Sequence, residues 1–280
     1  MKVALCMSGQ MRTYKRCYGY LYENILHPLD PDVFIHTWKN KGSTTKTSPN
    51  RNHKSKVKKE SLKKLYKPRS VKIEKFENEW FLEKDGIIVP EKLMEATDHW
   101  KGSIPMFYKI KKCNDLKSIH EKEKDFEYDI VIKIRPDLVV PKKIPERVLN
   151  RPSVLWYSGA HIDTEEQISD KFALSSSKNM DYYSSVWEKL NKYWENPLGN
   201  GNWKSIRVGE RLMRYHMSKC KVDTKPFSIG CNILRDVDFA LEKGKEAARE
   251  EAKRNPKIPL SNIAVYFEKK LSSLWSKLSL

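Results

Sequence analysis

The chain reads Tyr128-Asp-Ile-Val-Ile-Lys-Ile-Arg-Pro-Asp-Leu-Val-Val140 near its middle, an apolar run that leads into a charged turn. The run predicts a buried strand. Pro136 cannot extend a central ladder, so we expect the strand to end there and to expose both Arg135 and Asp137. Open α/β sheets bind ligands outside the carboxyl ends of their strands. The segment therefore predicts both a fold class and the place of a site.

Apolar runs and helical patterns alternate along the rest of the chain. We expect strands at 3–7, 32–38, 71–76 and 128–134 and helices at 11–26 and 98–121, followed by strands at 154–157, 171–174 and 221–229 and helices at 179–193 and 209–218. This alternation predicts an α/β fold of the Rossmann-like kind, with a central, mostly parallel mixed sheet flanked by helices.

The chain of 280 residues is expected to form one domain over 1–235, followed by a helical extension over 236–280. The extension carries one apolar helical stripe, which we expect to pack on the domain, with an interfacial membrane helix as the alternative. Its members are Ile263, Phe267, Leu271, Leu274 and Leu278. Residues 41–64 are rich in lysine and small polar residues and predict a mobile surface loop.

Composition limits the classes of partner. Lys and Arg number 54 against 36 Asp and Glu, and the formal charge of +18 favours anionic partners such as nucleotides, nucleic acid or a membrane surface. Five cysteines without a CxxC pair favour neither a disulfide framework nor a structural zinc site. We therefore expect a soluble protein of a reducing, cytoplasmic compartment, without a signal peptide or membrane span.

The first candidate site element is Ser8-Gly9-Gln10-Met11-Arg12, where the first strand gives way to the first helix. Backbone N–H groups, a hydroxyl, an amide and the Arg12 guanidinium converge there, which suits a phosphate or a nucleobase. The structural alternative is that Ser8 caps the helix and Gly9 permits the turn.

The second candidate element is the turn that holds Arg135 and Asp137. Asp137 is able to bind a divalent cation or a ribose hydroxyl, and Arg135 is able to neutralise a phosphate. The structural alternative is an internal Arg–Asp ion pair that closes the turn.

Two further carboxylates are candidates for a catalytic base, because each lies at the end of a predicted element: Asp170 precedes a strand and Glu210 begins a helix. Their structural alternatives are an Asx-turn and a favourable interaction with the helix dipole. The segment Trp156-Tyr157-Ser158 ends a strand and predicts a wall for an acceptor. The histidines, including His36 and His216, lack metal-ligand spacing and are expected to be structural.

The ordered motifs Ser8-Gly-Gln-Met-Arg12, Phe34-Ile-His-Thr-Trp38, the strand ending in Arg135-Pro-Asp137, and Ile168-Ser-Asp-Lys-Phe-Ala173 resemble a group of glycosyltransferases from large algal viruses and bacterial polysaccharide clusters. The resemblance covers about residues 1–220. It implies a GT-A fold, with a nucleotide-sugar-binding half over 1–140 and an acceptor and catalytic half over 141–235.

The resemblance also implies functional roles. By this resemblance, the residues that bind the donor are Ser8, Gly9, Gln10, Arg12, Arg135 and Asp137. The catalytic base is Asp170 or Glu210, and the residues that bind the acceptor are Trp156, Tyr157 and Ser158. A divalent cation, Mn²⁺ or Mg²⁺, is usual in such enzymes and would bind Asp137. Their usual Asp-X-Asp motif is here Arg135-Pro136-Asp137, so one acid is missing and the arginine is able to take over part of the role of the cation.

Among such enzymes the chain is most similar to those that add β-xylose to chlorovirus capsid glycans. This implies an inverting transfer from UDP-xylose to a glycan or glycoprotein acceptor, with no nucleic acid partner. The alternative from charge alone is a non-enzymatic nucleic-acid-binding protein, although no RNA-recognition signature, zinc finger or basic helix is present. A sulfotransferase would also be basic and α/β, but no phosphate loop of that type follows the first strand.

Overall fold

The computed structural model describes residues 1–42, 55–76, 83–96, 100–159, 167–195 and 209–234. The chain divides into two units, and the first, which spans 1–43 and 50–233, holds almost all of the described residues. The predicted extension at 236–280 and the middle of the basic segment lie outside the described residues.

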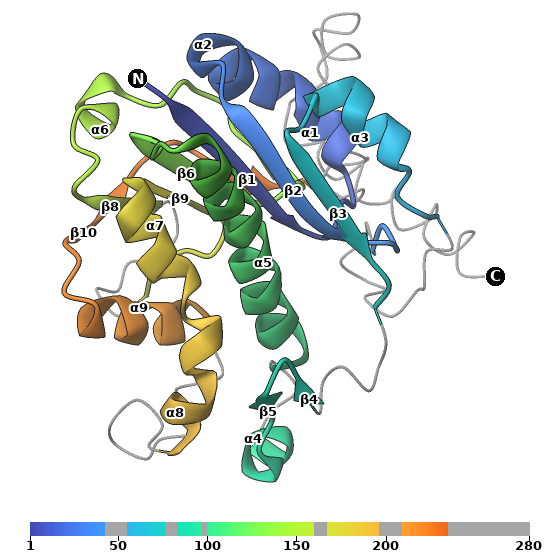
Figure 1. Ribbon diagram of the computed structural model, residues 1–280, viewed down its shortest axis with the longest axis vertical. Helices are drawn as coiled ribbons and strands as arrows, with labels where there is room; N and C mark the ends of the chain where they lie inside the picture. The colour runs from blue at the N-terminus through green and yellow to red at the C-terminus, as the bar shows by residue number, and fades with distance from the viewer. Residues whose placement is uncertain (43–54, 77–82, 97–99, 160–166, 196–208, 235–280) are drawn as a thin grey trace, which may run out of the picture. The chain divides into compact units, whose positions relative to one another are not determined.

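A seven-stranded sheet forms the centre of this unit, in the order β10-β8-β9-β6-β1-β2-β3 (Figure 1). The strands are β1 (Val3–Gly9), β2 (Asp32–Trp38), β3 (Ser70–Glu74), β6 (Ile130–Ile134), β8 (Leu155–Ser158), β9 (Phe172–Ser175) and β10 (Thr224–Phe227). β9 pairs antiparallel with β6 and β8, and the other four pairings are parallel. The predicted α/β class with a mostly parallel mixed sheet is confirmed.

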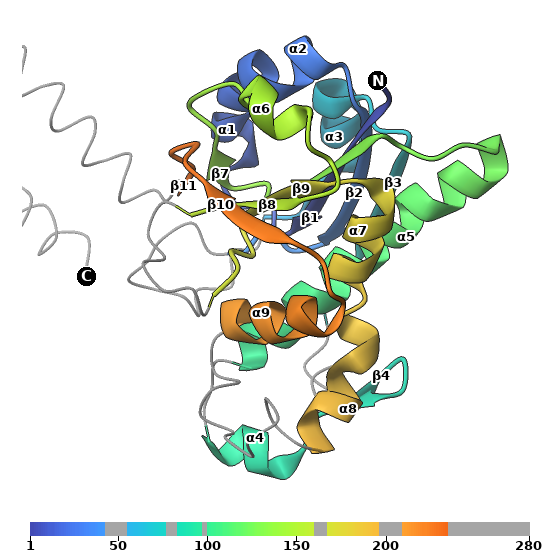
Figure 2. The same ribbon diagram turned by 90° about the vertical axis from the view of Figure 1, so that its left-hand side faces the viewer.

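Helices cover both faces of the sheet (Figure 2). One face carries α1 (Tyr14–Leu21), α3 (Lys59–Tyr66) and α6 (Glu146–Leu149), and the other carries α5 (Trp100–Lys124), α7 (Ser177–Ser184) and α9 (Gly209–Lys219). A π-helical turn (Tyr22–Leu26) and α2 (His27–Leu29) continue α1, while a 3₁₀ turn (Trp187–Lys189) and α8 (Leu190–Glu195) continue α7.

Smaller elements complete the described part. A hairpin of β4 (Glu83–Lys84) and β5 (Ile87–Ile88) and helix α4 (Glu91–Ala96) precede α5, and β7 (Leu138–Val139) pairs with β11 (Asn232–Ile233). No described helix has both the length and the apolar character needed to cross a membrane.

Two predicted elements need correction. The first helix begins at Tyr14 rather than at residue 11, because Arg12 adopts a left-handed backbone with φ of 30°. The predicted loop over 41–64 is wrong from Lys59 onward, where α3 begins. Leu62 of α3 is buried in the core, so its apolar contacts outweigh the polar composition of the segment.

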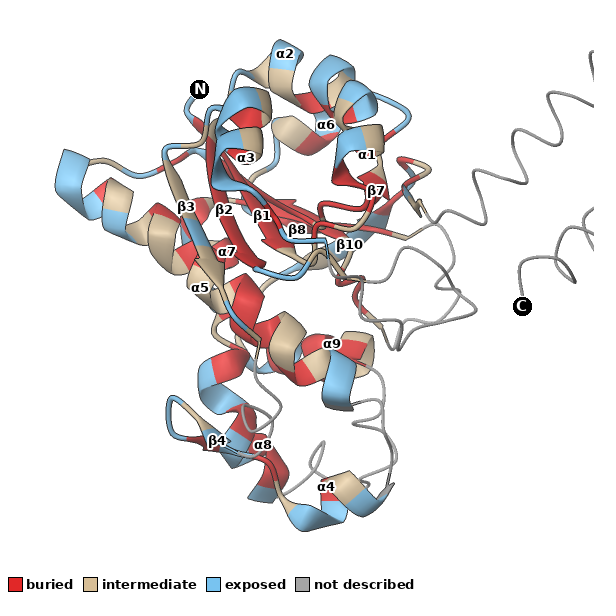
Figure 3. Ribbon diagram, turned by 90° about the vertical axis from the view of Figure 1, so that its right-hand side faces the viewer, coloured by how far each residue is buried: buried red, intermediate tan, exposed pale blue. Residues whose placement is uncertain are grey.

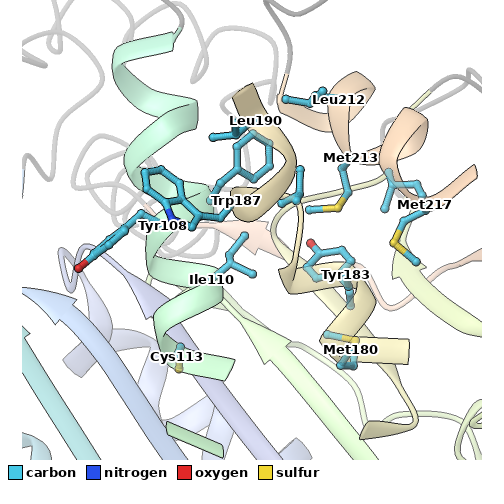
Figure 4. Close-up of a cluster of buried hydrophobic side chains, with 14 of the residues drawn as sticks. Tyr108, Ile110, Cys113, Met180, Tyr183, Trp187, Leu190, Leu212, Met213 and Met217 are labelled. Atoms are coloured by element: carbon cyan, nitrogen blue, oxygen red, sulfur yellow. The ribbon is translucent and has the colours of Figure 1, made fainter. Parts of the chain in front are cut away.

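Side chains alternate between the two faces along each central strand. In β1, Leu5 and Met7 join the core under α1 and α3, whereas Ala4 and Cys6 join the core under α5, α7 and α9. The central strands are buried on both sides (Figure 3). On the α5 side, Figure 4 shows Cys113 of α5, Met180 and Tyr183 of α7, and Met213 of α9 within one apolar cluster.

All five cysteines are free thiols in the described structure. Cys6, Cys17, Cys113 and Cys231 are buried, and Cys220, at the end of α9, is intermediate. Burial raises the pKa of Cys17 to about 11 and that of Cys231 to about 12. These buried thiols are therefore poor nucleophiles.

Candidate functional site

The candidate site lies where the strand order changes direction, between β1 and β6. The chain runs from β1 outward to β2 and β3 and then returns to place β6 on the other side of β1. A position of this kind, at the carboxyl ends of the strands, is where open α/β sheets bind their ligands. Both sequence-predicted loops, the one after Gly9 and the one after Ile134, begin at this point.

The turn after β1 is held from both sides. Gly9 has φ of 114°, which favours glycine, and its carbonyl oxygen accepts a hydrogen bond from Thr37 Oγ1 at 2.7 Å. The Arg12 N–H donates to the carbonyl of Lys41 at 2.8 Å. The Gln10 side chain lies against Gly42, where an added Cβ would meet Gln10 Oε1 at 2.5 Å.

Ser8 does not cap the first helix. It belongs to β1, and its Oγ is buried without a hydrogen-bond partner among the described residues. Thr13 precedes α1 and its side chain makes no capping bond either. The structural alternative for Ser8 therefore has no support from these contacts.

Asp137 brings the two predicted arginines together. Its Oδ1 accepts from Arg135 Nε at 3.0 Å, and its Oδ2 accepts from Arg135 Nη2 at 3.1 Å and from Arg12 Nη1 at 2.9 Å. The Asp137 side chain is 1% exposed, whereas about a fifth of each arginine side chain is exposed. The expectation that Asp137 would be exposed is wrong, because both guanidinium groups cover its carboxylate.

This geometry bears on the metal predicted at Asp137. Both carboxylate oxygens already accept charge-assisted hydrogen bonds, and a cation there would face two guanidinium groups at close range. No group of three or more His, Cys, Asp or Glu side chains in the described part of the chain is arranged to hold a metal ion. Asp137 as it lies does not fit a metal ligand.

Asp170 and Glu210 come together beside this cluster. Asp170 Oδ2 lies 3.6 Å from Arg135 Nη1, and the Glu210 carbonyl accepts from the Ile168 N–H at 3.0 Å. Burial raises the pKa of Glu210, and the charge of Asp170 together with a side-chain hydrogen bond to it acts in the same direction. Burial lowers the pKa of Arg135, but Asp137 and Asp170 outweigh it and leave that pKa above its ordinary value.

The antiparallel direction of β9 explains why Asp170 reaches the site. β9 begins at Phe172, opposite Ile134 at the end of β6. The residues that precede an antiparallel strand therefore share an edge with the residues that follow a parallel one. The Arg135 N–H, which donates to the Lys171 carbonyl at 3.1 Å, fixes the two segments side by side.

The three predicted acceptor residues do not share one surface. Trp156 is buried on the face of the sheet that α1, α3 and α6 cover, where its Nε1 donates to the Arg151 carbonyl at 3.1 Å. Tyr157 is buried on the α5 face, and Ser158 Oγ lies 3.1 Å from Ser169 Oγ, next to Asp170. Ser158 therefore contacts the segment that carries Asp170, whereas Trp156 belongs to the core on the other face of the sheet.

Two buried polar residues on the α5 face were not predicted as site residues. Lys133 Nζ and His36 Nδ1 have no hydrogen-bond partner among the described residues, and both side chains are almost fully buried. Burial lowers the pKa of Lys133 to about 8 and that of His36 to about 2. A sequence signal existed for Lys133, because a lysine inside the run Ile130-Val-Ile-Lys-Ile134 must be buried.

Comparison with family models and with curated proteins identifies no relative. A scan against models of known families gives no match, and a search of curated proteins finds no significant match.

Proposed function

We propose that the chain is a GT-A glycosyltransferase, which moves a sugar from a nucleotide-sugar donor to a hydroxyl group of a glycan acceptor. The observation that carries this proposal is the pairing of two groups at the point where the strand order reverses. Arg12 and Arg135 are held by the buried Asp137, and the carboxylates of Asp170 and Glu210 lie next to them. Guanidinium groups suit a diphosphate, and a carboxylate suits the activation of a hydroxyl.

The proposed chemistry is an inverting displacement. The base takes the proton of the acceptor hydroxyl, and that oxygen forms a bond to the anomeric carbon of the donor. The bond between this carbon and the diphosphate breaks, and its electrons remain on the leaving nucleoside diphosphate. Arg12 and Arg135 stabilise the charge that develops on the leaving phosphate.

Glu210 is the better candidate for the base. Its raised pKa brings it closer to neutral pH, which improves a general base, whereas Asp170 faces the Arg135 guanidinium. Asp170 is then a positioning residue that acts through Arg135 and Glu210. Glu210→Gln should lower the transfer rate by about 100- to 10,000-fold, and Asp170→Asn should lower it less. Normal rates in both variants would refute this part of the proposal.

The first test of function is a thermal-shift screen with UDP, GDP and CDP, followed by mass spectrometry of products from a panel of nucleotide sugars. UDP-xylose comes first in the panel, because the sequence resembles β-xylosyltransferases of chlorovirus capsid glycans. We expect a nucleotide to raise the melting temperature and a donor sugar to be transferred or hydrolysed. A chain that binds none of the nucleotides and releases no sugar would exclude the proposal.

The competing function is non-enzymatic binding of nucleic acid, motivated by the net charge of +18. Such binding would weaken steeply with salt and would be indifferent to nucleoside diphosphates. Tight duplex binding without any nucleotide response in the same screen would favour it. The cluster favours the enzyme, because a carboxylate with a raised pKa beside the arginines suits the activation of a hydroxyl group and has no role in binding a nucleic acid backbone.

A further inference from the structure

Among the residues that the structure describes, three lysines are buried on the α5 side of the sheet, and two of them have acceptors for their ammonium groups. Lys109 Nζ donates to Glu74 Oε2 at 2.7 Å and lies 3.4 Å from the centroid of the Trp38 ring. Lys117 Nζ donates to Ser177 Oγ at 2.6 Å and lies within 3 Å of carboxylate oxygens of Glu121 and Asp181. Each of these ammonium groups therefore recovers the cost of its burial from neighbouring acceptors.

Lys133 is the exception among these three. It is 2% exposed, and its Nζ has no hydrogen-bond partner among the described residues. A buried ammonium without an acceptor is costly, and native proteins seldom keep one without a reason. The chain would avoid this cost with an apolar residue, as at the neighbouring Ile132 and Ile134.

The strand register places a second unpaired polar atom on the same face. Lys133 pairs with Cys6 of β1, and Ser8 follows two residues later on that face of β1, one step nearer to the carboxyl end. Ser8 is 3% exposed, and its Oγ has no hydrogen-bond partner in the described part of the chain. His36, which pairs with Ser8 across β1 and β2, adds a third unpaired atom, Nδ1.

The charged groups that act on Lys133 lie at the carboxyl edge of the sheet. Burial has the largest effect on the pKa of Lys133 and lowers it. Among the charged groups Asp170 has the largest effect and raises this pKa, Arg135 lowers it, and Asp137 raises it. Cys113 of α5 lies on the same face. Asp170 lies outside the end of β6, while Lys133 is the second residue from that end. The charges of the arginine and carboxylate cluster therefore lie near enough to the Lys133 ammonium to act on its pKa.

We propose that Lys133 Nζ and Ser8 Oγ form, together with Arg12 and Arg135, a metal-independent binding site for the diphosphate group of a nucleoside diphosphate. This inference rests on the proposed function, because the diphosphate is that of the sugar donor. Three cations of the chain then provide the neutralisation that a divalent ion provides elsewhere. A phosphate oxygen supplies the acceptor that Lys133 lacks in the described structure.

The contacts at Asp137 support the metal-independent part. Its carboxylate holds both arginines in place, so the same residue that would bind a cation here organises two guanidinium groups instead. Phosphate binding to this group of cations would be charge-assisted at each contact. The site would prefer two linked phosphates to one, because its cations come from three separate positions of the chain, in β6, after β6 and after β1.

The test measures binding by calorimetry on the full chain, with UDP, UMP and inorganic pyrophosphate as probes, in EDTA and in Mn²⁺. The variants are Lys133→Met, Ser8→Ala and, as a matched control, Lys142→Met, which removes an exposed lysine from the same segment of chain. Lys133→Met keeps the volume and removes a buried unpaired charge, so the fold should be retained or stabilised. Urea unfolding of each variant checks this directly.

We expect UDP and pyrophosphate to bind the unmodified chain in EDTA, and UMP to bind more weakly. Lys133→Met should lower the affinity for UDP and pyrophosphate by about 10- to 100-fold, and Ser8→Ala by about 3- to 10-fold, while Lys142→Met leaves it unchanged. Folded Lys133→Met with unaltered UDP affinity would overturn the inference. UDP binding that requires Mn²⁺ would overturn it too, yet would leave the glycosyltransferase proposal intact.

The failure of the proposed function has a different signature. If pyrophosphate binds, and UDP, GDP and CDP all bind no more tightly than pyrophosphate, the anion site stands and the nucleotide-sugar donor is refuted. If neither binds under any condition, both proposals fall.

Discussion

Asp137 offers the sharpest test of the site, because one buried carboxylate accepts three hydrogen bonds from two arginines. The change Asp137→Asn keeps the shape of the side chain and removes its charge. The asparagine keeps one acceptor oxygen, but its NH₂ group replaces the second carboxylate oxygen. Two hydrogen-bond donors, this NH₂ group and a guanidinium N–H, then face each other. Two positive groups that Asp137 now separates would then face each other across a neutral residue.

The magnitude follows from burial. Removing one partner of a buried ion pair costs about 3 to 5 kcal/mol. Here each arginine side chain is about a fifth exposed, so water recovers part of the loss, and Asp170 remains 3.6 Å from Arg135. We therefore expect the free energy of unfolding to fall by about 2 to 3 kcal/mol.

Urea unfolding followed by circular dichroism measures this change. With a slope of about 2 to 3 kcal/mol per molar urea, the midpoint should fall by about 1 M. Asp181→Asn is the matched control, because Asp181 also accepts from a buried lysine but its side chain is 49% exposed, and Lys117 keeps Glu121 and Ser177 as partners. The control should lose less than about 1 kcal/mol. Equal midpoints for Asp137→Asn and the unmodified chain would refute the reasoning.

Three further predictions concern pH, each measured as the urea midpoint across a pH series. Burial, followed by the charge of Lys109, lowers the pKa of His36 to about 2, so below about pH 6.5 only the unfolded chain gains this proton. The free energy of unfolding should therefore fall on acidification, and His36→Leu should make that fall smaller. Burial lowers the pKa of Lys133 to about 8 from 10.5, so stability should rise with pH between these values, and an unchanged rise in Lys133→Met would contradict this. Burial raises the pKa of Glu210 above 4.5, so the free energy of unfolding should decrease as pH rises from 4.5 through the raised pKa. Glu210→Gln should therefore be more stable than the unmodified chain at pH 7, and this difference should disappear below pH 4.5. Identical midpoints at pH 7 would argue against a buried Glu210 carboxylate.

Much of the fold was predictable because buried strands consist mainly of apolar residues, which are visible in the sequence. The strand over Asp32–Trp38 was predicted with the bounds that the structure has, since its apolar run Val33-Phe-Ile35 is typical of a strand that is covered on both faces. The direction of β9 was not predictable, because an apolar run reads the same for either direction of pairing. The first helix was predicted to begin three residues too early, because apolar spacing says nothing about the left-handed backbone of Arg12.

The site was predictable in its charged residues and less so in its surroundings. Arg12, Arg135 and Asp137 meet as the strand-end argument requires, and Asp170 joins them only through the reversal of β9. That Trp156 lies on the face opposite to Tyr157 follows from the two-residue period of a strand and was available from sequence.

The partly exposed thiol of Cys220 makes it possible to label the end of α9 selectively. Four cysteines are sealed in the core, and Cys220 alone has partial access to solvent, directly after the last residue of α9. The same helix begins at Gly209-Glu210, about 16 Å away along an 11-residue helix. A fluorophore coupled to the unmodified chain should therefore attach at one place, at the far end of the element that carries the candidate base. Any shift of that helix when a donor binds would become visible as a change in emission, without the introduction of an artificial label site.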